Sequence, residues 1–181
     1  MKKSNLMILI TLGIIFFFFM AFQFKIHSHI QKGAIDEDSD IISETRSLQA
    51  FKKISVNHGI TVLFKQDSTT QISIESPESL MPYITTEVVN NELIIKKTKR
   101  IKSYDSITVS IINDQLYELK VDSWASFITK GMITGKDIKL DFNNKSTGNL
   151  EISYATVKCK ASSNSKIKIT GNSKHIDFSN H

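Results

Sequence analysis

The sequence predicts an all-β protein, a β-solenoid of stacked coils preceded by one N-terminal transmembrane helix. Three observations lead to this prediction. An uncharged apolar segment lies near the start of the chain, apolar and polar residues alternate after Phe51, and the C-terminal third repeats with a period of about 19 residues, which is typical of stacked β coils. Alternation with a period of two is typical of half-buried strands. We therefore expect a cytoplasmic stub and anchor at 1–25, an acidic flexible linker at 26–50 and an extracytoplasmic β domain at 51–181.

The predicted anchor is the segment 6–24, LMILITLGIIFFFFMAFQF, which contains no charged residue. A helix of this length spans about 28 Å, close to the roughly 30 Å of a hydrocarbon core. A cleavable signal peptide is the alternative, because Lys2 and Lys3 form a basic N-terminal region. Its apolar part would be unusually long, and phenylalanines stand where small residues precede a cleavage site. The N-terminal lysines favour a cytoplasmic N-terminus, which places the domain in the periplasm or outside the cell.

The predicted linker is acidic and poor in apolar residues. Its carboxylates are Asp36, Glu37, Asp38, Asp40 and Glu44. A calcium site is the alternative interpretation, but the segment lacks the glycine-bearing spacing of a calcium loop. We expect a solvated spacer between the membrane and the domain.

Composition excludes two classes of protein. Lysine and arginine number 23 against 18 aspartates and glutamates, and 21 against 18 once Lys2 and Lys3 are assigned to the other side of the membrane. This surplus is too small to indicate a nucleic-acid-binding face. Cys159 is the only cysteine, so no intramolecular disulfide can staple the domain. The fold must be stabilised by packing.

Strands are predicted wherever the period-two alternation is clear. They are Ile54–Val56, Ile60–Phe64, Ile72–Ile74, Leu93–Ile95, Ile107–Ile111 and Leu119–Val121. Between them, the stretch 77–88 has room for one short helical turn, which Pro82 limits.

The repeat consists of apolar-polar-apolar triplets at a constant spacing. These triplets are Leu119–Val121, Ile138–Leu140, Val157–Cys159 and Ile176–Phe178. Equivalent residues of stacked coils lie about 4.8 Å apart. The repeat therefore predicts an interior column of Val121, Leu140, Cys159 and Phe178, in which Cys159 is a buried structural thiol rather than a reactive one.

The same stacking predicts two outward columns. One holds Lys120, Lys139, Lys158 and Asp177, and the other holds Asp122, Asp141, Lys160 and Ser179. Charges in one column then compensate those of the other across the diagonal, as on a solvated face. A binding surface for anionic ligands is the alternative.

Two exposed features are candidates for a ligand surface. The basic stretch contains Lys96, Lys97, Lys99, Arg100 and Lys102, and it could contact anionic glycans or lipid head groups. A charged strand end that discourages edge pairing is the alternative. Trp124 lies at a predicted turn, where it either stacks on a sugar or fills the end of the first coil.

No catalytic, cofactor-binding or metal-binding residue is predicted. The five histidines lack a spacing that would bring them together, and the sequence contains no Gly-x-Ser-x-Gly, no glycine-rich phosphate loop and no His-Glu-x-x-His. We expect a protein that is not an enzyme.

The chain resembles the head GIN domain family, whose members are described as putative auto-transporter adhesins. The residues that carry the resemblance are Phe51–Val56, His58–Val62, Leu93–Ile95, Ile107–Val109 and the repeated triplets. It covers about residues 46–181. The resemblance implies a secreted or surface-exposed domain of stacked β coils, with no functional residues to transfer. Where relatives tend to have Ser-Gly turns, this chain has Asp122–Ser126 and Ser162–Ser165.

The leading functional hypothesis is a membrane-anchored, adhesin-like module that binds an envelope glycan or protein. A β-helix enzyme such as a polysaccharide lyase is one alternative, for which stacking could bring together only Asp122, Asp141, Lys120 and Lys139. A regulatory membrane subunit is another. The last coil opens just before residue 181, and its unpaired backbone groups favour self-association or strand addition by a partner.

Overall fold

A computed structural model describes residues 39–98, 107–162 and 164–180 of the chain, which form one twelve-stranded sheet. The first seven strands are β1 (Ile41–Arg46), β2 (Lys53–Val56), β3 (Thr61–Gln66), β4 (Gln71–Pro77), β5 (Ile84–Val89), β6 (Glu92–Lys97) and β7 (Thr108–Asn113). The other five are β8 (Glu118–Val121), β9 (Ser126–Thr129), β10 (Ile133–Phe142), β11 (Thr147–Ala161) and β12 (Lys166–Asn180). The only described helix is a 3₁₀ turn, η1 (Met81–Tyr83), which begins beside Pro82 in the stretch predicted for it.

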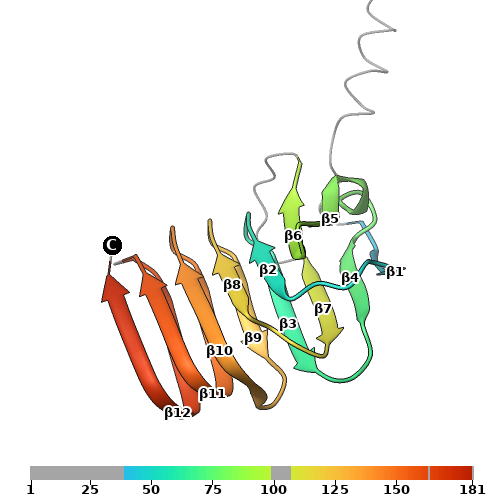
Figure 1. Ribbon diagram of the computed structural model, residues 1–181. Coiled ribbons are helices and arrows are strands. Elements are labelled where there is room, and N and C mark those ends of the chain that lie inside the picture. The colour runs from blue at the N-terminus through green and yellow to red at the C-terminus, as the bar shows by residue number, and fades with distance from the viewer. Residues whose placement is uncertain (1–38, 99–106, 163, 181) are drawn as a thin grey trace, which may run out of the picture. The chain divides into compact units, whose positions relative to one another are not determined.

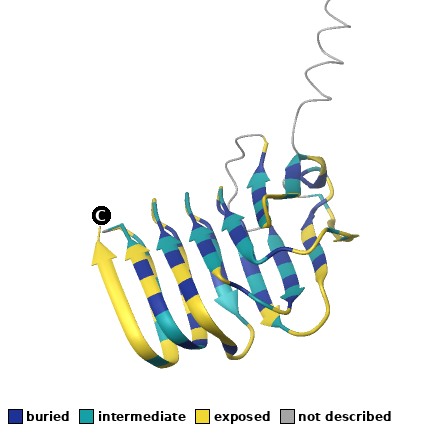
Figure 2. Cartoon of the chain, viewed as in Figure 1, coloured by how far each residue is buried: buried dark blue, intermediate teal, exposed yellow. Residues whose placement is uncertain are grey.

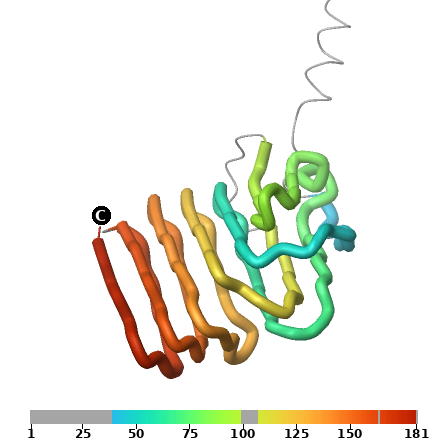
Figure 3. Tube along the Cα trace, viewed as in Figure 1, coloured from blue at the N-terminus to red at the C-terminus, as the bar shows by residue number. Residues whose placement is uncertain are grey.

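The sheet is strongly curled in its C-terminal half. The first residues of β11 pair with β9, whereas its later residues pair with β10, so a single strand passes from one side of the curl to the other. Figure 3 shows this part of the chain as successive U-shaped bends that follow one another in sequence order. The all-β prediction is confirmed, and the architecture is a curled half-barrel sheet (Figure 1).

The register of the curled strands corrects the predicted repeat. Leu140 pairs with Cys159, and Cys159 with Phe178, so these two steps have the length that the triplet spacing predicts. The step from β8 to β10 is two residues longer than the triplet spacing, because Leu140 pairs with Leu119 rather than with Val121. Val121 pairs with Phe142, one column away. The two extra residues lie between β8 and β10, and the triplet spacing alone does not show them.

The longer step also changes which residues share an outward column. Lys120 lies opposite Asp141, which lies opposite Lys160, so opposite charges are adjacent within one column. The predicted placement of Lys120 beside Lys139 is wrong. Lys139 instead lies between Glu118 and Lys158.

The interior of the curl is apolar and tightly packed. Leu119, Leu140 and Cys159 expose 0%, 1% and 1% of their surface, which confirms the buried thiol. Burial, with a smaller contribution from Asp141, raises the pKa of the Cys159 thiol to about 11. Phe178 belongs to the same column by register but is 62% exposed, so the predicted interior stack does not enclose its last member. Figure 2 shows β12 as the most exposed of the curled strands.

The N-terminal strands pair differently from the C-terminal ones. Three of their pairs are antiparallel, namely β1 with β4, β4 with β7 and β5 with β6. β1 falls inside the segment 26–50 that the sequence assigns to the linker, so the β domain begins before residue 51. Its exposed, polar composition explains why the alternation did not reveal it.

The predicted anchor, residues 6–24, lies outside the described residues. Within the ranges that the structure does describe, no helix has the length and apolar character needed to cross a bilayer.

Candidate functional site

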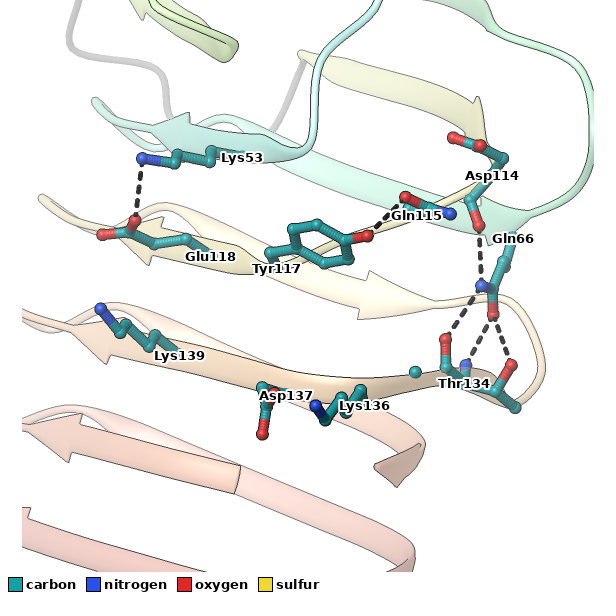
Figure 4. Close-up of a pocket in the computed structure, with 11 residues that line it drawn as sticks. Lys53, Gln66, Asp114, Gln115, Tyr117, Glu118, Thr134, Lys136, Asp137 and Lys139 are labelled. Atoms are coloured by element: carbon teal, nitrogen blue, oxygen red, sulfur yellow. Dashed lines mark hydrogen bonds and ion pairs between the residues drawn. The ribbon is translucent and has the colours of Figure 1, made fainter. Parts of the chain in front are cut away.

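An open groove of about 640 Å³ lies where the connection between β7 and β8 passes the first residues of β10 (Figure 4). Its lining comes from four parts of the chain, namely β2, the end of β3, the 114–118 segment and β10. β8 is short while β10 is long, so the start of β10 extends past β8 and leaves a hollow beside it. The groove therefore marks the position at which the repeating part of the sheet meets the irregular part.

Gln66 holds three of these segments together. Its side-chain Nε2 donates to the Asp114 carbonyl at 2.8 Å and to the Thr134 carbonyl at 3.0 Å. Its Oε1 accepts from the Thr134 backbone N–H at 2.6 Å. One side chain at the end of β3 thus fixes the distance between the 114–118 segment and β10, as Figure 4 shows.

Asn113 fixes the 114–118 segment from inside the protein. Its side chain is 1% exposed, and Nδ2 donates to the carbonyls of Phe51 at 3.0 Å and Gln115 at 2.8 Å. Thr70 donates to Asn113 Oδ1 at 3.0 Å. A buried amide whose oxygen and nitrogen are both hydrogen-bonded does not destabilise the fold. Loss of any partner would leave an unsatisfied buried polar group and lower the free energy of unfolding. The segment is therefore a rigid part of the groove.

Tyr117 supplies an aromatic surface to the groove. Its backbone N–H donates to the Lys52 carbonyl at 2.8 Å, and its hydroxyl donates to Gln115 Oε1 at 2.7 Å. The Lys52 ammonium lies over the ring, 5.2 Å from the centroid. The residue is nevertheless 44% exposed, so part of the ring is available to a ligand in a fixed orientation.

The floor beside Tyr117 depends on a glycine. A Cβ atom at Gly135 would lie 2.4 Å from the Tyr154 ring, which is closer than atoms can approach. Tyr154 is buried, and its hydroxyl donates to the Leu116 carbonyl at 2.9 Å. Burial, and to a lesser extent Tyr117, raises the pKa of Tyr154 to about 12, so the phenol stays protonated and keeps this bond.

Charges in the groove balance. Three ammonium groups face three carboxylates, namely Lys53, Lys136, Lys139, Asp114, Glu118 and Asp137. Lys53 and Glu118 are 3.5 Å apart, and both are partly exposed, so this pair contributes little to stability. A groove without net charge does not select for anions.

The predicted basic surface is only partly described. Lys96 is partly exposed and lies 3.5 Å from Glu87. Lys97 is 6% exposed, so its side chain does not belong to an exposed basic surface. Lys99, Arg100 and Lys102 lie outside the described residues, and their contribution to a ligand surface stays a prediction.

Trp124 stands on a tight turn and is 53% exposed, so it does not fill the end of a coil. Its φ of 61° and the 53° of Ser123 lie in the left-handed region, which is rare for a residue with a large side chain. The Lys145 ammonium, from the turn between β10 and β11, lies 5.4 Å from the ring centroid. The turn thus displays an aromatic ring beside a cation.

The four residues of the lyase alternative do not meet in one groove. Lys139 lines the groove, but Lys120 binds Glu92 at 3.2 Å and Glu118 at 3.5 Å. Burial lowers the pKa of Lys120, and the two glutamates more than offset this effect, so that the pKa is raised. Asp141 accepts from Asn143 at 2.8 Å. Lys120 and Asp141 are thus engaged on the outer face of the curled sheet.

Asp122, the fourth of these residues, accepts hydrogen bonds from Ser123 and Asn144 at the turn. Among the described residues, no group of three His, Cys, Asp or Glu side chains could hold a metal ion.

Sequence reasoning did not find the groove, since its residues share no motif and come from distant parts of the chain. One signal was present. The pair Gln115 and Tyr117 interrupts the regular alternation just before the first triplet, at the point where the repeat starts.

Comparisons with solved structures show the same fold. A putative adhesin from Bacteroides fragilis superimposes with a TM-score of 0.73 at 13% identity, over 79% of this chain and 68% of its own. A putative adhesin from Parabacteroides merdae gives 0.62 at 19% identity, over 79% and 70%. A putative lipid binding protein from Parabacteroides distasonis gives 0.60 at 16% identity, over 81% and 74%. None of the curated proteins matches the chain.

The family comparison is more specific. The model of the family described as putative auto-transporter adhesin, head GIN domain, matches residues 50–180, which is most of the chain and almost all of the β domain. It covers both the irregular N-terminal strands and the curled C-terminal strands. The chain therefore belongs to the head GIN domain family of putative auto-transporter adhesins.

Proposed function

We propose that this protein is a non-enzymatic, adhesin-like module of the cell envelope that binds a neutral or zwitterionic glycan in the groove beside Tyr117. The observation that carries the proposal is the exposed Tyr117 ring, held in one orientation between polar walls. In this proposal the curled strands act as coils of a β-solenoid, a rigid support that keeps the groove in shape.

The chemistry of the groove suits a sugar. A tyrosine ring offers an apolar face and a polar edge, so it can contact the C–H face of a pyranose while neighbouring groups bind its hydroxyls. Asp114, Asp137 and Gln115 supply acceptors, and Lys136 and Lys139 supply donors. The balanced charge argues against a strongly anionic ligand such as a phosphate-rich polymer.

Location is the second part of the proposal. Residues 6–24 anchor the chain in a membrane with the N-terminus in the cytoplasm, and the β domain lies in the periplasm or outside the cell. Membership of an adhesin-like family supports an envelope-exposed position. Residues 25–40 separate the apolar segment from the first described strand, β1.

A second contact surface is favoured by the Trp124 turn. The ring and the Lys145 ammonium together present a cation and an aromatic face to solvent. Lys96, Lys99, Arg100 and Lys102 form a separate candidate for an anionic partner in the envelope.

Glycan binding can be tested with the full chain in detergent micelles on a panel of immobilised neutral, zwitterionic and anionic glycans. We expect retention of a neutral or zwitterionic glycan, and Tyr117→Ala should weaken it by about tenfold or more, or about 1.4 kcal/mol. Tyr117→Phe is the matched control, because it keeps the ring and removes only the hydroxyl. Equal binding by the parent and Tyr117→Ala, or selective retention of anionic glycans, would refute the proposal.

A further inference from the structure

At the free edge of β12, apolar side chains on the interior side of the curled sheet are exposed to solvent. β12 pairs with β11 along one edge, and no strand among the described residues pairs with the other. Ile176 and Phe178 pair with the buried Val157 and Cys159, so their side chains point to the interior side. They are 49% and 62% exposed, because no other described strand covers them.

The first half of β12 has the same arrangement. Ile167 and Ile169 pair with Gly148 and Leu150, both buried, and are themselves only partly covered. The outward side chains of this half include Lys166 and Lys168, while the second half carries Asp177 outward. The two halves of one strand thus have matching apolar residues, with Lys168 and Asp177 as opposite charges between them, while the exposed Lys174 lies next to the bend.

We infer that this edge is a two-fold interface with a second copy of the chain, in which each β12 pairs antiparallel with the β12 of the other copy. The axis passes through the bend near residues 172–173, so the first half of one strand lies against the second half of the other. Ile167 then faces Phe178, Ile169 faces Ile176, and Lys168 faces Asp177. Each contact occurs twice, as a two-fold interface requires.

The hydrogen-bonding phase agrees with this register. The Lys166 N–H donates to the Ser146 carbonyl, toward β11, so alternation turns the N–H and C=O groups of Ile167 and Ile169 to the free edge. In the preceding coil the Ser162 N–H donates to the Phe142 carbonyl. The same alternation in β12 turns the backbone N–H and C=O groups of Ile176 and Phe178 to the free edge. An antiparallel partner strand can therefore bind the backbone N–H and C=O groups of Ile167, Ile169, Ile176 and Phe178.

Other registers lose this agreement. A shift by one residue places interior side chains opposite outward ones, since successive side chains point to opposite faces. A shift by two residues places Lys168 opposite His175 or Ser179 and removes the contact of Ile167 with Phe178. Lysines on an edge strand usually discourage pairing. Here the proposed register offsets the charge of Lys168 with Asp177, so it permits one pairing and disfavours the rest.

Disulfide cross-linking of the full chain in detergent tests the register. Positions 168 and 177 form a non-hydrogen-bonded antiparallel pair, for which Cα atoms lie about 4.5 Å apart, within the range that a disulfide bridges. We expect the double variant Lys168→Cys/Asp177→Cys to give a covalent dimer on mild oxidation. The buried Cys159 does not interfere.

The controls for cross-linking use the same chemistry in a wrong register. Neither single cysteine variant should cross-link alone, but an equimolar mixture of the two should. Lys168→Cys/Ser179→Cys, which fits a register shifted by two residues, should give no covalent dimer. The absence of a dimer from the 168/177 pair, or equal yields from the single variants, would overturn the inference.

A charge exchange tests the same interface without covalent capture. Lys168→Asp places two like charges opposite each other at both ends of the interface and should weaken the dimer by about tenfold in sedimentation measurements. Lys168→Asp/Asp177→Lys should restore it, and Lys65→Asp on β3, which changes net charge equally, should leave it unchanged. A double variant as weak as the single one would contradict the pairing. Because Tyr117 is not involved, this result is independent of glycan binding.

Discussion

The C-terminal strands and the N-terminal strands of this protein differ in how they pair. β10, β11 and β12 lie in sequence order and pair in parallel with a constant step, so the triplet of each lies directly beside that of the preceding strand. β1 to β7 mix parallel and antiparallel pairs, and β4 lies between β1 and β7. The groove lies where the two kinds of pairing meet. Repetition thus makes a stable support, and the break in repetition makes a hollow with side chains from four segments.

The largest expected effect tests the burial gradient along the repeat. Ile138 and Ile176 belong to one column, and they are 1% and 49% exposed. Ile138→Ala should lower the free energy of unfolding by about 2–5 kcal/mol, because it removes buried methylenes and leaves a cavity. Ile176→Ala should cost less than about 1 kcal/mol, because it leaves no enclosed cavity. Urea denaturation of the monomer, at a protein concentration below that at which the proposed dimer forms, measures both, and similar losses would show that the last strand is covered within one chain as fully as the others.

High pH should weaken the repeat through Cys159. Its pKa rises from 9.0 to about 11 on folding, so the unfolded thiol ionises first and the folded state loses stability between those two values. The loss is on the order of 2–3 kcal/mol. Stability contributed by this group is complete below pH 9.

Cys159→Ala isolates the thiol. Tyr154, with a pKa of about 12, produces a similar decline at higher pH in both proteins, so only the difference between their unfolding curves from pH 9 to 11 reports on Cys159. Parallel curves in this window would mean that the thiol is accessible to water.

A smaller effect is expected at the junction. Asn113→Asp keeps the shape of the side chain but removes both donors to Phe51 and Gln115, and it should cost about 1–3 kcal/mol. Glycan binding should fall as well, because the 114–118 segment loses its inner support. Asn149→Asp, on an exposed position of β11, is the control for added negative charge. Unchanged stability in Asn113→Asp would show that Gln66, Tyr154 and the backbone bond of Tyr117 hold the segment without Asn113.

The smallest effect concerns Trp124. Trp124→Gly relieves the left-handed backbone, which costs a large residue about 1–2 kcal/mol, and loses the contact with Lys145, worth about 0.5–1 kcal/mol. The variant should be as stable as the parent or slightly more stable in urea denaturation. A loss of about 3–5 kcal/mol, the usual cost of truncating a buried aromatic residue, would show that the ring packs against the sheet.

The sequence predicted the regular half better than the irregular half, and the reason is physical. Alternation reports which face of a strand is buried, so Leu140 and Cys159 were placed correctly in one column. It does not report turn length, and for this reason Val121 was assigned to the wrong column. β1 was missed because an edge strand that buries little needs no apolar pattern.

The candidate groove was beyond sequence reasoning for a related cause. Gln66 and Asn113 act by hydrogen bonds between segments far apart in the chain, and polar residues of this kind carry no periodic signal. Trp124 could be predicted at a turn, but its exposure depends on left-handed φ values that a sequence of Ser123 and Trp124 does not suggest.

The separation between paired residues also has a kinetic consequence. Neighbours in β10 and β11 belong to consecutive strands, whereas Lys53 of β2 must find Glu118 of β8 across five intervening strands. Closing the longer loop costs more chain entropy before any contact compensates for it, and folding slows as contacts become more distant in sequence. The C-terminal strands can thus nucleate locally, while docking β2 and β3 onto β8 and β9 limits the rate at which the groove is assembled.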